Sequence, residues 1–212
     1  MKRNLIFAGI LVLMVLLDPL QILAQSRIEI SPYGGYMFGG KLRFYEGDLK
    51  IDDEVNYGLA MDFAVATDTK IEISWSQMST TARFKPYFGY DYLNADPFDV
   101  NVGYIQVGSI RELDLDNNIV PYGGMTLGAA YFAPQNSVYS DSWKFAAGLG
   151  LGTKIWITDK VGLRLQGRLL LPFFWAGAGF TVGTGGSGFS VGAGTSMLQG
   201  DFTGGLVIGL GD

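Results

Sequence analysis

Residues 55–65 read VNYGLAMDFAV. Every second residue, from Val55 to Val65, is large and apolar, whereas the residues between them are small or polar. Alternation with a period of two is typical of a β-strand, because successive side chains point to opposite faces of a sheet. Residues 143–157, WKFAAGLGLGTKIWI, repeat the pattern, with glycine or alanine at most of the intervening positions. Both segments predict strands with one large apolar face and one narrow face.

Six further segments show weaker alternation. They are residues 27–38, 70–83, 99–113, 119–132, 161–171 and 198–210. The segment 99–113 is apolar on both faces, which we interpret as a phase slip or a β-bulge. The short links are 67–69, 114–118 and 158–160, and they alternate with four long links, 39–54, 85–98, 133–142 and 172–197. This order predicts an antiparallel up-and-down β-barrel with short turns at one end and long loops at the other.

The start of the chain has the composition of an export signal. Two basic residues open it, an apolar run from Leu5 to Leu17 follows, and the small residue Ala24 comes after a break. This order is typical of a signal peptide, and the run is shorter than the roughly 20 residues of a spanning helix. We therefore expect residues 1–25 to be a signal peptide and residues 26–212 to form one barrel domain.

Composition removes most classes of enzyme. The chain has 212 residues and contains neither cysteine nor histidine. Disulfides, cysteine-ligated metals, imidazole ligands and histidine-based triads are therefore excluded. Without the signal peptide, 13 basic and 19 acidic residues remain, a balance that disfavours nucleic acid as a partner. We expect no cofactor, no metal centre and no enzymatic activity.

Alternation alone does not decide which face of the barrel is apolar, because a soluble lipocalin-like barrel also has eight strands. A water-facing exterior carries charge on roughly 25–35% of its residues, yet the less apolar face here is mostly small. Small residues suit the narrow interior of an eight-stranded barrel, and an apolar face of about 11 residues matches a tilted transmembrane strand. Aromatic residues near the strand ends predict interfacial girdles. They are Tyr57, Trp75, Tyr104, Tyr131 and Trp143. We favour a membrane barrel, with the soluble barrel as the alternative.

The signal peptide, the eight alternating segments, the short turns and the Gly/Tyr-rich loops together resemble a known group. The whole mature chain is similar to the small eight-stranded outer-membrane β-barrels of Gram-negative bacteria, the OmpA/OmpX/opacity-protein type. The resemblance is one of architecture and carries no specific motif. It implies an all-β, antiparallel up-and-down transmembrane barrel that lies in outer-membrane lipid and is inserted by the barrel-assembly machinery. Members usually end in an aromatic residue that this machinery recognises, whereas residues 206–212 read LVIGLGD.

Charged residues on the less apolar face would point into the lumen. They are Glu29, Asp62, Glu72, Lys144, Lys154, Arg164, Arg168 and Asp201. We expect an ion-pair and hydrogen-bond network that fills the barrel, because buried charges need partners. A narrow polar conduit gated by Arg164 and Arg168 is the alternative. Catalysis by Asp62 and Glu72 would require further groups that the sequence does not supply.

Three of the long links have a marked composition. Residues 176–194 are rich in glycine without the Lys-Ser/Thr of a P-loop, and predict a β-hairpin. An acidic group without regular ligand spacing favours a solvated loop over a calcium site; it consists of Glu46, Asp48, Asp52, Asp53 and Glu54. An aromatic group would either form an adhesive surface or pack over the barrel mouth; it consists of Tyr87, Phe88, Tyr90, Tyr92 and Phe98.

The pattern as a whole indicates a monomeric outer-membrane barrel. Its expected role is structural, or surface recognition or adhesion, through four extracellular loops that bind an unknown ligand. A narrow channel or a small-ligand transport barrel is the main alternative, and a soluble secreted binding barrel is a further one. A lipid-modifying enzyme without histidine would need an unusual carboxylate or Tyr/Ser mechanism.

Overall fold

The computed structural model describes residues 28–43, 47–88, 96–113, 115, 118–135, 141–174, 178–183, 186–191 and 195–211. The expected signal peptide, residues 1–25, lies outside these residues. The strands are β1 (Ile28–Phe38), β2 (Lys41–Arg43), β3 (Gly47–Ile51), β4 (Glu54–Ala64), β5 (Thr69–Pro86), β6 (Phe98–Glu112), β7 (Ile119–Pro134), β8 (Ser142–Trp156), β9 (Val161–Phe174), β10 (Ala178–Gly183), β11 (Gly186–Val191), β12 (Thr195–Ser196) and β13 (Gln199–Leu210).

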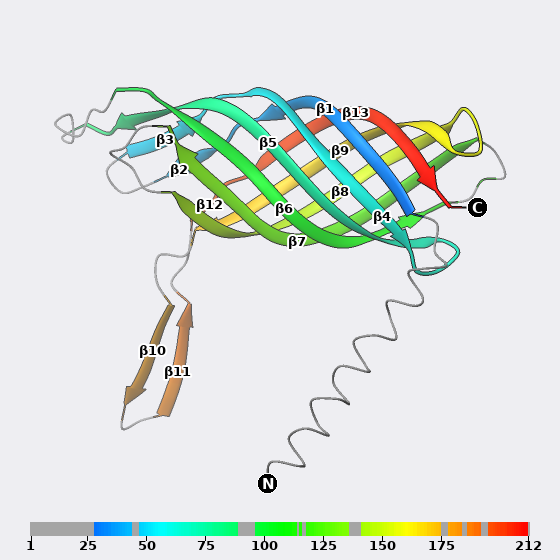
Figure 1. The fold of residues 1–212 in the computed structure, drawn as a ribbon. Helices are drawn as coiled ribbons and strands as arrows, with labels where there is room; N and C mark the ends of the chain where they lie inside the picture. Colours follow the sequence, from blue (N-terminus) through cyan, green and yellow to red (C-terminus); the bar gives the residue numbers. More distant parts are fainter. Residues whose placement is uncertain are drawn as a thin grey trace, which may run out of the picture.

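Eight of these strands close into a single barrel (Figure 1). Their order around the wall is β1, β4, β5, β6, β7, β8, β9 and β13, with β13 paired to β1. Every pairing between neighbours is antiparallel. The eight-stranded up-and-down barrel expected from the sequence is therefore confirmed, and each predicted strand lies within about three residues of an observed one.

The two ends of the barrel differ in the length of their connections. One end, the turn end, carries the links β4–β5, β6–β7 and β8–β9 together with the start of β1 and the end of β13. The other end, the loop end, carries the long links. In the turn after β4, Asp68 accepts hydrogen bonds from Thr69 and from the Arg111 side chain of β6. These bonds lower the pKa of the Asp68 carboxyl and tie two neighbouring turns together.

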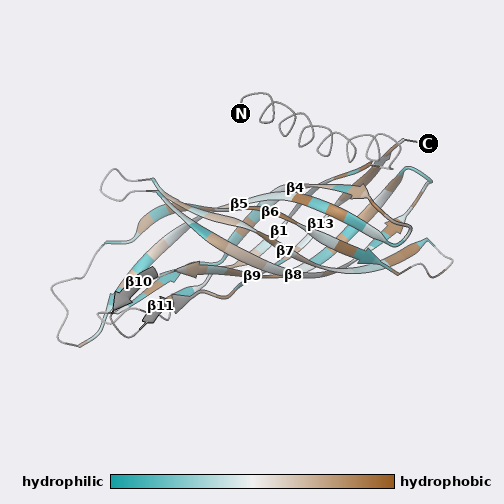
Figure 2. Cartoon of the chain, turned by 90° about the horizontal axis from the view of Figure 1, so that it is seen from below, coloured by the Kyte–Doolittle hydropathy of each residue, from teal (hydrophilic) through white to brown (hydrophobic). Residues whose placement is uncertain are grey.

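The large apolar side chains of the wall point outward. Leu59, Met125, Leu149, Leu151 and Phe202 are all exposed, and hydrophobic and hydrophilic residues alternate along the strands (Figure 2). A closed sheet satisfies its own backbone groups, so an apolar outer face makes it a transmembrane barrel. The soluble lipocalin-like alternative is therefore wrong. Within the described residues no helix is long and apolar enough to cross a membrane.

Two expectations about the wall are wrong. The registers of β6 with β5 and with β7 run without interruption, so residues 99–113 contain no bulge. The strand is apolar on both faces because Val100 and Val102 are buried inside the barrel while Ile105 and Val107 face outward. Tyr104 also points inward and is buried, so it belongs to no girdle. The outward pairs Tyr57–Trp75 and Tyr131–Trp143 do make ring contacts, with centroids 5.8 Å and 5.3 Å apart.

The link 39–54 contains two short strands that the sequence did not suggest. β2 pairs with β3, and β3 pairs with the last residues of β5, beyond the start of β4. The outward side of this extension is charged, whereas Leu42 and Ile51 on its inner side are buried. The Gly-rich hairpin of residues 176–194 is confirmed, because β10 and β11 pair with each other in a two-stranded sheet separate from the barrel.

Tyrosine side chains cover glycines on neighbouring strands inside the narrow barrel. Tyr122 is the register partner of Gly152, and Tyr33 is the register partner of Gly58. A Cβ at Gly152 would lie 2.5 Å from the Tyr122 hydroxyl, and a Cβ at Gly58 would lie 2.6 Å from the Tyr33 hydroxyl. The missing side chain therefore provides the space into which each ring packs, as aromatic residues do beside strand glycines.

We predict that Gly152→Val lowers the stability of the folded barrel by about 1–3 kcal/mol, because the new side chain overlaps the Tyr122 ring and the backbone of β9. Urea unfolding of the barrel in lipid vesicles measures the change. Gly34→Ala is the matched control, since the nearest atom to its Cβ is 3.6 Å away. Equal stability of the Gly152→Val variant and the control would contradict the packing argument.

Candidate functional site

Three acidic side chains occupy adjacent inward positions on one wall of the lumen. Glu29 of β1 is the register partner of Asp62 of β4, and Asp62 is in turn the partner of Glu72 of β5. All three are at most 1% exposed. Like charges directly opposite each other on neighbouring strands repel. This wall therefore requires cations from elsewhere in the barrel.

The cations come from the far wall, where they are also neighbours of each other. Lys154 of β8 is the register partner of Arg164 of β9. The Lys154 ammonium lies 2.5 Å from a Glu29 carboxylate oxygen and 2.7 Å from an Asp62 oxygen. Arg164 pairs with Asp62 at 3.1 Å and also with Glu72. Each wall thus neutralises the other across the lumen.

Three more residues complete this group. Lys70 of β5 lies 2.5 Å from Glu29 and 2.8 Å from Glu112 of β6, and Glu112 also pairs with Lys154 at 2.7 Å. Arg164 donates a hydrogen bond from Nε to the Tyr122 hydroxyl at 2.7 Å. We call these side chains the turn-side cluster; its members are Glu29, Asp62, Lys70, Glu72, Glu112, Tyr122, Lys154 and Arg164.

Sequence reasoning missed Lys70, Glu112 and Tyr122. Lys70 and Glu112 lie near the ends of the predicted strands 70–83 and 99–113, but they were not assigned to the charged set that faces the lumen. A signal was nevertheless present, because Lys70 is in phase with Glu72, and Glu112 is in phase with Val100 and Val102 on the inward face of β6. Tyr122 is in phase with Gly124 and Gly128 on β7 in the same way.

A second ionic group lies nearer the loop end. Arg168 of β9 donates a hydrogen bond from Nε to its register partner Asp201 of β13 at 3.0 Å. Asn56 of β4 donates to the same carboxylate at 2.9 Å, and the Arg168 guanidinium lies 5.3 Å from the Tyr33 ring centroid. We call these four side chains the Arg168 group. They join β1, β4, β9 and β13.

Lys144 is the one residue of the predicted network that lies in neither group. It is on the inward face of β8 but ten residues before Lys154, at the loop end of the strand, and it is half-buried. The other seven predicted residues are buried and occur in one of the two groups.

An apolar layer fills the lumen at the loop end. We call it the loop-side layer; it contains Met37, Leu42, Ile51, Met78, Ala82, Val100, Val102, Phe132, Leu170 and Met197. Met37, Met78 and Met197 are fully buried. Met197 packs against Gly40, where a Cβ would approach its Cγ to 2.2 Å. The layer thus includes residues of the barrel wall and of the links that cross its mouth.

Two carboxylates of the acidic link are in ion pairs. Asp48 pairs with Lys41 at 2.5 Å, and Asp52 pairs with Arg83 at 2.8 Å. Asp53 accepts a hydrogen bond from the backbone N–H of Gly39. Glu46 lies outside the described residues. Across the described part of the chain, no group of three or more acidic side chains is arranged to hold a metal ion.

The aromatic link divides between two environments. Phe98 is half-buried and packs against the loop-side layer, whereas Phe88 is fully exposed. The Tyr87 hydroxyl donates a hydrogen bond to Asp48 of β3 at 2.8 Å. Tyr90 and Tyr92 lie outside the described residues. The link therefore both contributes to the closed mouth and presents an aromatic side chain to solvent.

The closed antiparallel wall with its outward apolar face has counterparts among solved structures of outer-membrane proteins. The crystal structure of Neisserial surface protein A superposes with a TM-score of 0.54 at 15% identity, covering 85% of this chain and 96% of that chain. The crystal structure of the outer membrane protein OprG from Pseudomonas aeruginosa gives 0.55 at 10% identity, covering 88% and 97%. The chain has the fold of the small outer-membrane β-barrels. No protein-family model matches it, and no curated protein does.

The fold and the apolar wall together place this outer-membrane barrel in a bacterial outer membrane, surrounded by lipid. The lumen chemistry that accompanies the fold is electrostatic. Every carboxylate of the turn-side cluster contacts a lysine or an arginine. Asp62 and Glu72, the pair considered for acid–base catalysis, share Arg164 as a partner.

We predict that Lys154→Met destabilises the barrel by about 3–5 kcal/mol, because it removes the one buried cation that contacts Glu29, Asp62 and Glu112 together. Urea unfolding in lipid vesicles is the measurement. Lys85→Met, which removes an exposed lysine at the loop end of β5, is the control and should change the free energy of unfolding by less than about 0.5 kcal/mol. Similar effects for the two variants would contradict the importance of the cluster.

Proposed function

We propose that this chain is a non-conducting, non-enzymatic outer-membrane barrel that acts in envelope structure and surface recognition through its loop end. The observation that carries the proposal is the filling of the lumen at two levels by different chemistry. Ion pairs fill it near the turn end, and apolar side chains fill it near the loop end.

The turn-side cluster opposes ion flow because its charges are already paired. Strands β1, β4, β5, β6, β8 and β9 contribute charged side chains, so the contacts cross the whole section of the barrel. An ion that crossed this level would have to displace a buried partner, and breaking such pairs is costly. Eight-stranded barrels have room only for their own side chains, which agrees with this reading.

The loop-side layer opposes water as well as ions. Its methionine, leucine, valine and phenylalanine side chains offer no hydrogen-bond partner, and an apolar constriction excludes water from a pore. Because Leu42, Ile51 and Met197 belong to the links, the layer also ties those links to the wall. We therefore assign the external contacts to the parts of the loop end that lie beyond this layer.

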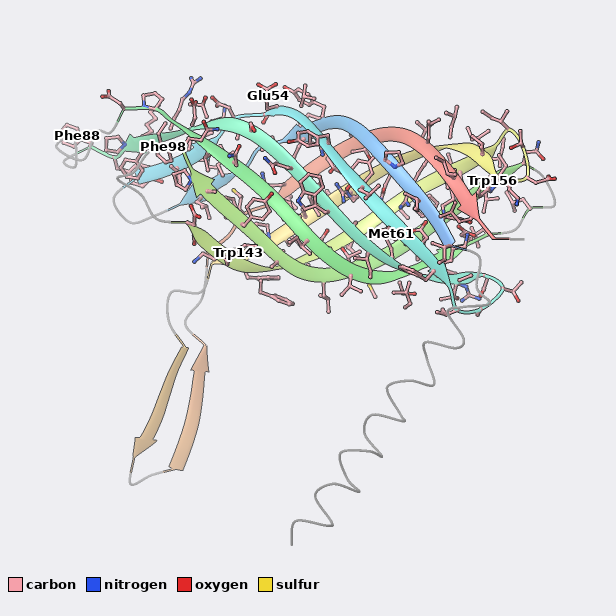
Figure 3. The ribbon with its side chains drawn as sticks, viewed as in Figure 1. Glu54, Met61, Phe88, Phe98, Trp143 and Trp156 are labelled. Carbon is pink, nitrogen blue, oxygen red and sulfur yellow. The ribbon has the colours of Figure 1, made fainter. Side chains whose placement is uncertain are left out.

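The link between β5 and β6 is the strongest candidate for recognition. These two strands continue past the start of β4 at Glu54, and Phe88, which follows β5, lies at the far loop end of the described chain (Figure 3). We call the part of β5 and β6 beyond the start of β4, together with Phe88, the β5–β6 arm. The β2–β3 extension pairs along β5 and supports this arm. A fully exposed phenylalanine on a supported arm fits a contact surface, because aromatic residues are enriched where proteins bind partners.

Export and assembly are part of the same proposal. Residues 1–25 would act as the signal peptide and residues 26–212 as the mature barrel. The barrel-assembly machinery would insert the chain as a monomer.

We predict that purified protein in planar lipid bilayers produces no reproducible unitary conductance, because both levels of the lumen are filled. Protection of the same preparation from added protease would show that barrels have inserted, and a porin added to the same bilayer would show that single channels are detectable. A unitary conductance that Arg164→Ala alters would contradict the proposal and favour the narrow channel.

We further predict that Phe88→Ser lowers the binding of cells that display the barrel to a panel of glycan-, protein- and lipid-coated surfaces. We expect a loss of about tenfold if Phe88 is a central contact. Val107→Thr, an outward substitution in the lipid-facing wall, is the control and should leave binding unchanged. Binding that is equal for Phe88→Ser and the unmodified chain at equal surface amount would count against the arm as the contact surface.

A further inference from the structure

The middle of the lumen, between the turn-side cluster and the loop-side layer, contains polar atoms whose hydrogen-bonding capacity the protein does not use. Both amide atoms of Gln106 are buried without a protein partner. The same holds for Ser31 Oγ, Ser76 Oγ, Asn56 Oδ1 and Gln199 Nε2. Buried polar groups in folded proteins almost always have a partner, and where the protein supplies none, ordered water does.

Glycines line the β7–β8 wall at this level of the lumen, so polar side chains can approach its backbone. On β8, Gly148 and Gly150 face inward, and their register partners on β7 are Thr126 and Gly124. The place where a Gly148 Cβ would stand lies 2.4 Å from the Thr126 hydroxyl and 3.1 Å from Gln106 Nε2. The wall of β7 and β8 is therefore bare where two polar side chains converge.

A small cavity of about 10 Å³ lies at this place. Its polar lining comes from Glu72, Tyr122, Thr126, Gln166 and Arg168, and its bare backbone comes from Gly124, Gly148 and Gly150. A volume of roughly 10–15 Å³ holds one water molecule, and such a molecule needs two to four polar partners. The cavity meets both requirements.

We propose that one ordered water molecule is bound in this cavity, in contact with Glu72, Thr126, Gln166 and Arg168. The Gln106 amide lies beside Gly148, one of the residues that line the cavity. The water molecule lies between Glu72 of the turn-side cluster and Arg168 of the Arg168 group. The water therefore joins the two ionic groups into one hydrogen-bonded column that ends below the loop-side layer. This inference does not depend on the proposed function, since a closed barrel and a gated one would both contain the site.

Gly150→Ala tests the proposal because its methyl group would enter the cavity without meeting the backbone closely. The new Cβ would lie 3.2 Å from Gln166 Nε2 and 3.6 Å from Arg168 Cγ. If water occupies the site, the methyl displaces it and cannot replace its hydrogen bonds, so we expect the apparent melting temperature to fall by about 2–4 °C. If the cavity is dry, the methyl fills it and the melting temperature rises, which would overturn the proposal. Gly34→Ala, on the outward face of β1, is the control for the glycine-to-alanine change itself.

Nuclear magnetic resonance of the unmodified barrel in micelles gives a second, independent readout. We expect magnetisation transfer from water to the side-chain amides of Gln106 and Gln166, and its loss in Gly150→Ala. Absence of transfer in the unmodified barrel would overturn the proposal even if Gly150→Ala failed to fold. Transfer that persists unchanged in a folded Gly150→Ala variant would place the water elsewhere and overturn the assigned site.

Discussion

The barrel depends on the fact that no charge of the turn-side cluster is neutralised by its register partner in the wall. Glu29, Asp62 and Glu72 are nearest neighbours of the same sign, and so are Lys154 and Arg164. The closed sheet fixes these neighbours, because every backbone group in hydrocarbon must be paired along the strands. Contact across the lumen is then the available way to lower the repulsion, and it joins strands from the two ends of the chain. The ion pairs therefore stabilise the closed barrel as a whole rather than single hairpins.

Contacts across the lumen require space for long side chains. Strands β7 and β8 provide more of this space than the other strands, because glycines lie on their inward faces. The inward face of β8 carries Gly148, Gly150 and Gly152, and that of β7 carries Gly124 and Gly128. Long side chains stand beside them on neighbouring strands: Tyr122 is the register partner of Gly152, and Arg168 is the register partner of Gly150. A glycine in a strand normally weakens it. Here the cost is offset because the bare backbone accommodates the buried charges and, in our proposal, one water molecule.

The architecture was predictable from the sequence, since the period-two pattern of residues 55–65 and 143–157 extends along whole strands and the links alternate in length. The same alternation made it possible to predict which charged side chains face the lumen. Which charges meet was not predictable, because pairing across the lumen depends on the stagger of strands far apart in sequence. Lys154 and Glu29, for example, are separated by 125 residues. The β2–β3 extension was missed because strands of three and five residues carry too little alternation to be recognised.

The lumen changes along the barrel axis, from ion pairs near the turn end to apolar side chains near the loop end. This change separates the residues that stabilise the barrel from the residues at the loop end that are exposed to solvent. The turn-side cluster contains only strand residues at the turn end, so changes in the loops do not reach it. The loop-side layer, in contrast, includes Leu42, Ile51 and Met197 from the links. Substitutions at the exposed tip, such as Phe88, leave both levels intact, whereas substitutions at the base of the loops would disturb the layer and the arm that it supports. The residues exposed at the loop end can therefore differ while the turn-side cluster and the loop-side layer, which fill the lumen, stay the same.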